Sequence, residues 1–142
     1  MLTHPTLDLL RELGLTGMAK GFQSLDAQPE ARGLDHAEWL GLLLDQEVTV
    51  RRQKRFESRA RTARLRQDAS LEDVDYQAAR GLDRSLFLKL GSCDWIRSKR
   101  NLLLTGPCGV GKSFLACALG HLACRAGFLV RFSRADSLLR LL

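Results

Sequence analysis

The sequence lacks the long apolar runs and the leader segment that mark membrane and secreted proteins. No apolar run approaches the roughly 20 residues that a membrane-spanning helix needs. The first residues, Met1 to Pro5, contain no basic stretch followed by an apolar one, so no secretory signal is expected. These absences predict a cytoplasmic protein that has no membrane partner.

The spacing of the cysteines does not suit a structural metal site. The four cysteines include no C-x-x-C pair, and no histidines stand at a matching spacing. Cys117 and Cys124 lie seven residues apart in a predicted helix, where we expect them to be small buried apolar residues. Cys108 is different, because it lies within a glycine-rich loop.

Acidic residues are outnumbered, and the excess of positive charge is concentrated in one place. The 142 residues carry a net charge of +6, which favours an acidic partner such as nucleic acid. Between residues 51 and 66 only Glu57 is acidic, so this segment carries +7 and the rest of the chain nets to −1. The basic residues of the segment are Arg51, Arg52, Lys54, Arg55, Arg59, Arg61, Arg64 and Arg66.

This basic segment is interpreted as a double-stranded DNA contact. Arginine suits phosphate binding, and nothing in the sequence resembles a base-reading helix-turn-helix, so we expect salt-sensitive binding with little sequence preference. The alternative is a solvated helix face, which is the common meaning of a charge run.

One motif dominates the second half of the chain. Residues 106–113 read Gly-Pro-Cys-Gly-Val-Gly-Lys-Ser and match G-x-x-x-x-G-K-[ST] at every fixed position. The apolar run 101–105 before it predicts a buried strand, and residues 114–124 after it are mostly helix formers. Strand, glycine-rich loop and helix in this order predict a phosphate-binding P-loop, also called Walker A.

The residue types explain the chemistry that the loop would perform. Glycines at 106, 109 and 111 allow the backbone N–H groups to turn inward around an anion. The N-terminus of the following helix adds unpaired donors and a favourable dipole. Lys112 is expected to reach the β- and γ-phosphates of ATP, and the Ser113 hydroxyl to ligate Mg²⁺. The predicted nucleotide-binding residues are Gly106, Pro107, Cys108, Gly109, Val110, Gly111, Lys112 and Ser113.

The N-terminal part of the chain reads as helical. Helices are predicted over residues 6–13, 16–27 and 35–67, with Gly14 ending the first. Glu38, three residues after Asp35, completes a capping box for the long helix. The apolar stripe of that helix, which we expect to pack on the first two helices, comprises Leu40, Leu44, Val48, Phe56, Ala60 and Ala63.

The remaining elements complete an α/β prediction. A helix is expected over residues 78–90, a second strand over 128–132, and a last helix beginning near 133–136 with four leucines behind it. The fold class is therefore a helical domain, residues 1–68, followed by the start of a truncated P-loop parallel-sheet domain, residues 69–142.

The second acidic motif of a P-loop NTPase is missing from the sequence. Such enzymes need an apolar strand that ends in Asp and serves the Mg²⁺ site. Among the 29 residues after Ser113 the one acid is Asp136, and it does not follow an apolar strand. We therefore expect ATP binding rather than hydrolysis, and assign no catalytic residue.

With these motifs in view, the chain resembles the IstB-like ATPases, helpers encoded beside the transposase of certain bacterial insertion sequences. The resemblance rests on the P-loop and its preceding strand, on the segments 75–83 and 93–96, and on 116–120 and 130–132. That family belongs to the AAA+ ATPases and is similar to DnaC-type helicase loaders.

The resemblance implies ATP binding, self-assembly on duplex DNA and partnership with the transposase of the same element. Two further hypotheses stay open: a DnaC-like helicase loader acting as a replication adaptor, and an inactive truncated remnant. A small-molecule P-loop kinase is disfavoured, because 105 residues precede the loop.

Overall fold

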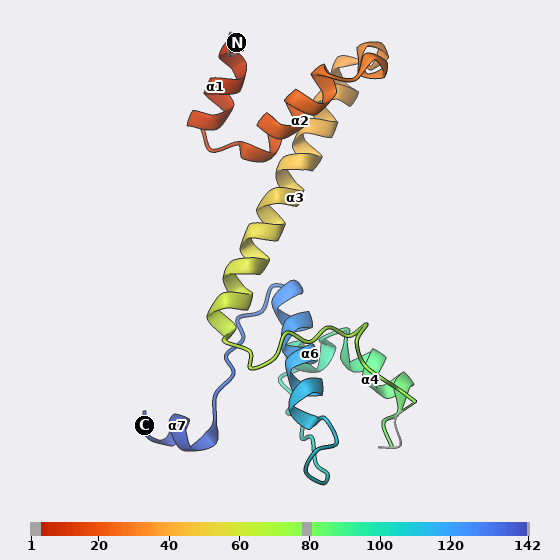
Figure 1. Ribbon diagram of the computed structural model, residues 1–142, viewed down its shortest axis with the longest axis vertical. Helices are drawn as coiled ribbons and strands as arrows, with labels where there is room; N and C mark the ends of the chain where they lie inside the picture. Colours follow the sequence, from red (N-terminus) through yellow and green to blue (C-terminus); the bar gives the residue numbers. More distant parts are fainter. Residues whose placement is uncertain (1–3, 78–80, 142) are drawn as a thin grey trace. The chain divides into compact units, whose positions relative to one another are not determined.

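A computed structural model describes residues 4–77 and 81–141 of the chain (Figure 1). Its helices are α1 (Pro5–Glu12), α2 (Thr16–Asp26), the 3₁₀ helix η1 (Pro29–Gly33), α3 (His36–Ala63), α4 (Arg84–Leu90), α5 (Asp94–Arg97), α6 (Lys112–Arg125) and α7 (Ala135–Leu139). The chain forms two compact units, unit 1 (Met1–Arg55) and unit 2 (Phe56–Leu142), which divide inside α3. The functional division predicted at residue 68 stays a prediction.

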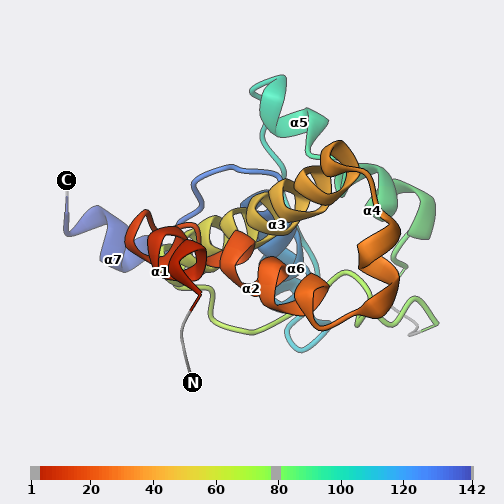
Figure 2. The same ribbon diagram turned by 90° about the horizontal axis from the view of Figure 1, so that it is seen from above.

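Unit 1 consists of α1, α2, η1 and the first part of α3 (Figure 1 and Figure 2). The predicted stop at Gly14 is confirmed: its φ of 72° follows the end of α1, where a side chain would be strained. Part of the predicted capping box is present as well, since the Asp35 N–H donates to Glu38 Oε2 over 3.2 Å. Local sequence signals therefore fix where these helices begin and end.

The face of α3 that packs against α2 is not the predicted one. Leu40, Leu44 and Val48 of the expected stripe are 49%, 49% and 43% exposed, whereas Leu43 and Glu47 are buried. The reason lies on α2, where glycines let α3 approach closely. A Cβ at Gly17 would lie 2.6 Å from the Glu47 Cα. The α2–α3 contact thus centres on Glu47 rather than on the leucine stripe.

Unit 2 is built around α6, whose buried face supplies much of its core. Leu115, Cys117, Ala118 and Leu119 of α6 form one cluster with Phe87 of α4. The predicted burial of Cys117 and Cys124 is confirmed, because both are 0% exposed. α6 ends at Arg125, and Gly127, which follows the C-cap Ala126 with a φ of 97°, is the predicted helix stop.

The two predicted strands do not form within the described residues. The segments 101–105 and 128–132 have neither helical turns nor a bridging partner strand. Exposure nevertheless alternates along them, with Leu103 and Leu129 each 86% exposed and their neighbours half-buried. A strand is defined by the ladder it makes with another strand, and these segments pair with none in this part of the chain. The predicted start of a parallel sheet is therefore not shown by the described residues.

Other helix boundaries differ from the prediction for local reasons. α3 ends at Ala63 rather than near 67, and Arg64 follows with a φ of 51°. α4 begins at Arg84 because the Asp83 carboxylate accepts hydrogen bonds from the N–H groups of Ser85 and Leu86. Residues 78–80 of the predicted 78–90 helix, and Leu142 of the last helix, lie outside the described residues.

Among the described helices, none is long and apolar enough to cross a membrane.

Candidate functional site

The glycine-rich loop leads directly into the N-terminus of α6. Gly106, Gly109 and Gly111 have φ values of 149°, 83° and 90°, a region that L side chains rarely adopt. Gly111 is also the N-cap of α6, and no side chain caps the first N–H groups of the helix. The three glycines thus form the bend that brings the loop onto α6, whose first N–H groups have no side-chain cap. Figure 1 shows this loop leading into α6.

Lys112, the first residue of α6, folds back over this loop. Its Nζ donates to the carbonyl oxygens of Gly106 at 2.8 Å and of Pro107 at 2.5 Å. The ammonium therefore lies at the beginning of the loop, beside the bend. An ammonium held there by carbonyl groups can exchange them for the oxygens of an anion.

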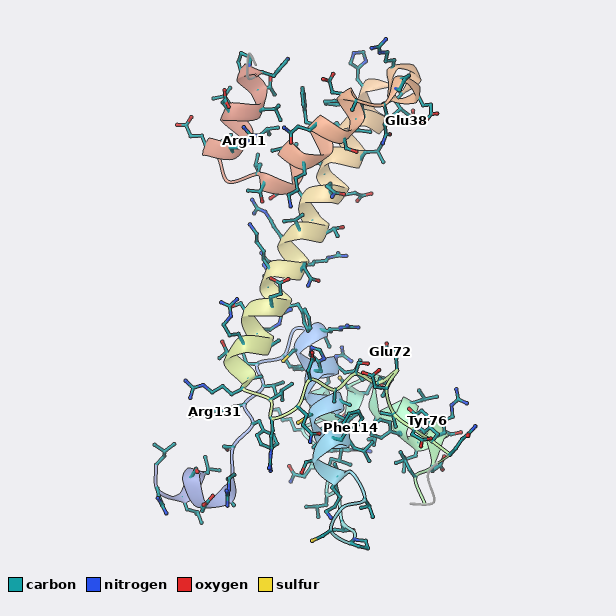
Figure 3. The ribbon with its side chains drawn as sticks, viewed as in Figure 1. Arg11, Glu38, Glu72, Tyr76, Phe114 and Arg131 are labelled. Atoms are coloured by element: carbon teal, nitrogen blue, oxygen red, sulfur yellow. The ribbon has the colours of Figure 1, made fainter. Side chains whose placement is uncertain are left out.

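The rest of the motif is open to solvent on one side and anchored on the other. Residues 106–109 and Ser113 are exposed, so a ligand could reach them. The next residues, Phe114 and Leu115, pack on or within the core of unit 2. Figure 3 labels Phe114 at this end of α6. The loop is thus a surface feature attached to a buried helix.

A hollow of about 450 Å³ lies beside Tyr76, which belongs to the segment 75–83 that contributes to the family resemblance. The Arg84 guanidinium stands over the Tyr76 ring, 5.3 Å from its centre, and Phe87 meets the ring edge-on at 6.3 Å. The Tyr76 hydroxyl is buried without a hydrogen-bond partner among the described residues. Ordinary packing accounts for the ring, which lies against the core that includes Phe87 (Figure 3).

In unit 1, two of the predicted DNA-binding residues contact the protein itself. The Arg51 Nε donates to Glu47 Oε1 over 2.7 Å, although half of the arginine side chain stays exposed. The Lys54 Nζ donates to Thr16 Oγ1 over 3.3 Å. Arg52 and Arg55 are exposed. Lys54 thus joins α3 to α2, Arg51 pairs with Glu47 within α3, and Arg52 and Arg55 face solvent.

In unit 2, Arg59 likewise has an internal role. Its Nε donates to the Cys124 carbonyl oxygen over 2.8 Å, at the C-terminal end of α6. Arg61, Arg64 and Arg66 are exposed, and the last two follow the end of α3. Arg61 and Arg64 line a hollow of about 300 Å³ together with Asp68 and His121. These arginines, rather than Arg59, are available to a phosphate.

Glu47 is a structural residue that the sequence analysis missed. Its Oε2 accepts hydrogen bonds from the N–H groups of Gly17 at 2.7 Å and Met18 at 3.0 Å. The Arg51 hydrogen bond, with help from those two amides, holds the pKa of this buried carboxyl below its ordinary value. The signal was present, since Leu15 at the N-cap of α2 has no polar side chain to cap the helix.

No group of three or more potential metal ligands of the His, Cys, Asp or Glu type occurs within residues 4–77 and 81–141. Asp136, the one acid after Ser113, is exposed in the first turn of α7, and its Oδ1 lies 3.4 Å from the Arg134 Nε. The metal assignment therefore depends on Ser113 and on oxygens that a ligand would bring.

Comparisons with known proteins agree with the motif. Residues 8–142 match the family described as IstB-like ATP binding protein. A relative from Sinorhizobium fredii, named as an insertion sequence ATP-binding protein, is 54% identical over 97% of this chain and 56% of its own. Similar proteins of Pseudomonas fluorescens and Pseudomonas aeruginosa are 46% and 36% identical, over 98% and 96% of this chain. The chain spans 51% to 61% of the length of these three relatives. The chain belongs to the IstB-like ATP binding protein family.

Proposed function

We propose that this chain binds ATP with Mg²⁺ through residues 106–113 and serves as the nucleotide-binding part of a helper protein in DNA transposition. The observation that carries the proposal is the loop itself: three glycines at positive φ lead into an uncapped helix, and the Lys112 ammonium rests on the loop. The relatives whose names join insertion sequences to ATP binding support the same assignment.

Each part of the loop has a chemical role in the proposal. The backbone N–H groups of the loop and of the first turn of α6 surround the phosphates. Lys112 moves from the carbonyls of Gly106 and Pro107 to the β- and γ-phosphate oxygens. The exposed Ser113 hydroxyl ligates Mg²⁺, and phosphate oxygens of the nucleotide bind the same ion. The proposal concerns binding of the nucleotide.

Titration with a fluorescent ATP analogue and Mg²⁺ tests the proposal. Lys112→Ala removes the ammonium and is expected to weaken binding at least tenfold, whereas the matched control Lys89→Ala, an exposed lysine of α4, leaves it unchanged. Ser113→Ala is expected to reduce the dependence of binding on Mg²⁺. Equal affinities of the parent chain and Lys112→Ala would overturn the nucleotide site.

Thiol labelling gives a second, independent measurement at the same loop. Cys108 is exposed, whereas Cys93, Cys117 and Cys124 are buried. Iodoacetamide should therefore react with Cys108 first in the folded chain. Bound ATP is expected to slow that reaction, and labelling that ATP does not change would contradict a ligand at the loop.

The proposed DNA contact belongs to the exposed basic residues of each unit. Arg52 and Arg55 of unit 1, and Arg61, Arg64 and Arg66 of unit 2, offer guanidinium groups to solvent. Phosphate contacts of this kind carry little sequence information and weaken as salt rises. The transposase of the same element and further copies of the protein are the other proposed partners.

Duplex binding measured at several salt concentrations tests this contact. Replacing Arg52, Arg55 and Arg61 by Ala should lower the salt slope by about one unit per contact that is lost. Arg32→Ala, an exposed arginine outside the basic segment, serves as the control. An unchanged slope in the triple variant would contradict the assignment.

A further inference from the structure

The hollow of about 300 Å³ beside the C-terminal end of α3 brings an acid, an amide and an imidazole together with two arginines. Arg61 belongs to α3, Arg64 and Asp68 follow it, and His121 reaches the same hollow from α6. Gln67 completes the polar part of the wall. All five residues belong to unit 2, and no residue of the glycine-rich loop lines this hollow.

The charged groups of this hollow are unpaired within the part of the chain that the structure describes. None of the ion pairs found there includes Arg61, Arg64 or Asp68. These three residues and Gln67 are exposed to solvent. Their hydrogen-bond donors and acceptors are therefore available to a ligand, unlike those of Arg59, whose Nε already donates to a backbone carbonyl.

The imidazole of His121 is held beside the hollow by an aromatic contact. Its ring centre lies 5.1 Å from that of Phe56, and the two planes are tilted by 35°. The Arg125 guanidinium stands over the same Phe56 ring, 5.5 Å from its centre. His121 is half-buried in this arrangement. A ring that neighbouring side chains hold in place is the kind of group on which unpaired bases stack.

Asp68 argues against a site for phosphate alone. A carboxylate repels a phosphate, so it would weaken the binding of a purely anionic ligand that the two arginines attract. The same carboxylate, together with the Gln67 amide, suits the amino groups on the edge of a nucleobase. The volume also lies at the lower end of the roughly 300–1,000 Å³ of typical ligand pockets. Phosphate-binding arginines beside base-binding acceptors match one nucleotide.

A base that enters a hollow cannot stay paired within a duplex. Proteins that take a base into a pocket act on single-stranded DNA or on a nucleotide extruded from the stack. A carboxylate only accepts hydrogen bonds, so it favours a base that carries an amino group. Guanine has such a group, whereas thymine has none.

We propose that this hollow binds one unpaired nucleotide of DNA. The phosphate lies on Arg61 and Arg64. The base stacks on His121 and donates hydrogen bonds to Asp68 and Gln67. The inference rests on the proposed DNA contact of the basic residues, and it adds to that contact a preference for DNA in which a nucleotide has lost its partner.

Three fluorescently labelled duplexes test the proposal with the whole 142-residue chain. Each ends in one unpaired nucleotide, which is dG, dT or an abasic sugar, and all three carry the same number of phosphates. Anisotropy titrations at one salt concentration should give the tightest binding for dG and the weakest for the abasic form. The expected difference is about fivefold or more, as base stacking provides.

Arg64→Gly removes one guanidinium without a threat to the fold. Arg64 has a φ of 51°, which glycine adopts freely and arginine adopts rarely. The urea midpoint of unit 2, followed by Trp95 in a Trp39→Phe background, should therefore be unchanged or higher. The preference for dG over the abasic duplex should be lost. Arg140→Ala, an exposed arginine of the same unit outside the basic segment, should keep that preference.

Asp68→Ala separates base binding from phosphate binding. Loss of the carboxylate should remove the difference between dG and dT, whereas binding of the abasic duplex should stay equal or become tighter. Equal binding of the dG and abasic duplexes by the parent chain would overturn this inference and leave the DNA contact standing. A dG preference that persists in both Arg64→Gly and Asp68→Ala would overturn it as well. If none of the duplexes binds, the DNA contact and this inference are both wrong.

Discussion

Unit 1 and unit 2 bury their helices against different kinds of group. In unit 1, α2 meets α3 through a buried carboxylate, Glu47, whose oxygens accept two backbone N–H groups and one guanidinium N–H. In unit 2, the core around α6 is apolar, with Phe87, Cys117 and Ala118 fully or almost fully buried. The stability of a buried polar contact depends on the ionisation state of its charged group. The stability of an apolar core depends instead on how completely its side chains fill the available volume.

We therefore expect the stability of unit 1 to respond to pH and that of unit 2 to respond to changes in side-chain volume. Each unit contains one tryptophan, whose fluorescence can follow its unfolding. Trp39 packs edge-on against Phe22 in unit 1, with ring centres 5.4 Å apart, and Trp95 belongs to unit 2. Variants with Trp95→Phe or Trp39→Phe therefore follow one unit at a time. The predictions below use that property to separate the units.

The largest effect is expected from Phe87→Ala. Phe87 is 1% exposed, so truncation leaves a cavity and should lower the free energy of unfolding of unit 2 by about 3–5 kcal/mol. Urea unfolding followed by Trp95 measures the change. Leu86→Ala, at a 57% exposed neighbour, is the matched control and should cost far less. A similar decrease in the free energy of unfolding for both variants would contradict a tightly packed core around Phe87.

Gly17→Ala should destabilise unit 1 by about 2–3 kcal/mol, because the new methyl group would meet the backbone of α3 at Glu47 and Gln46. Gly41→Ala, which meets nothing within 4 Å in the same unit, should instead stabilise it by about 0.5–1 kcal/mol through helix propensity. Urea unfolding followed by Trp39 gives both values. Equal signs for the two variants would contradict the close α2–α3 approach.

Glu47→Gln should lower the stability of unit 1 by about 1–2 kcal/mol at neutral pH, since it removes the charge that accepts from Arg51. The folded-state pKa of Glu47 is lowered, so its contribution is present above the ordinary glutamate pKa of about 4.3 and is lost as the pH falls through the folded value.

The loss of stability at acid pH gives a sharper comparison between the two units. The thermal unfolding temperature of unit 1, followed by Trp39, should fall in the parent chain as the pH drops below the ordinary glutamate pKa, and less steeply in Glu47→Gln. In unit 2 the pKa values of Glu72 and Asp94 are lowered too, by hydrogen bonds from the Glu72 N–H and from Ser92, but both residues are exposed. A steeper acid loss in unit 2 than in unit 1 would reverse the comparison.

The smallest effect concerns Arg59, which the sequence assigned to DNA and the structure places on the Cys124 carbonyl. Arg59→Ala should cost unit 2 about 1 kcal/mol, as expected for a lost hydrogen bond at a helix C-terminus. Arg61→Ala, exposed two residues further on, should leave unfolding unchanged. Should Arg61→Ala destabilise unit 2 and Arg59→Ala not, the internal role of Arg59 would be wrong.

The helices were predictable because their signals are local. The Gly14 and Gly127 stops, the capping residues and the run after the glycine-rich loop depend on neighbours a few residues apart. The strands were not predictable in the same way, since 101–105 and 128–132 need a partner from elsewhere to make a ladder.

The packing face of α3 shows a second limit. Leucines at 40, 42, 43 and 44 occupy several faces of one helix, so periodicity alone could not select the buried one. What selects Leu43 and Glu47 is the small size of Gly21 and Gly17 on α2, four residues apart. For the candidate site, the sequence motif predicted that three glycines would shape the loop, but not where the Lys112 side chain would rest.

That resting position ties two parts of the chain together. Lys112 opens α6, and its hydrogen bonds to Gly106 and Pro107 fasten the first turn of the helix to the entry of the loop. A phosphate that binds the Lys112 ammonium must replace these two hydrogen bonds with bonds to its own oxygens. Removing the lysine would therefore loosen the empty loop as well as weaken an occupied one. Lys112→Gln, which keeps an N–H donor but removes the charge, distinguishes a lost tether from a lost charge.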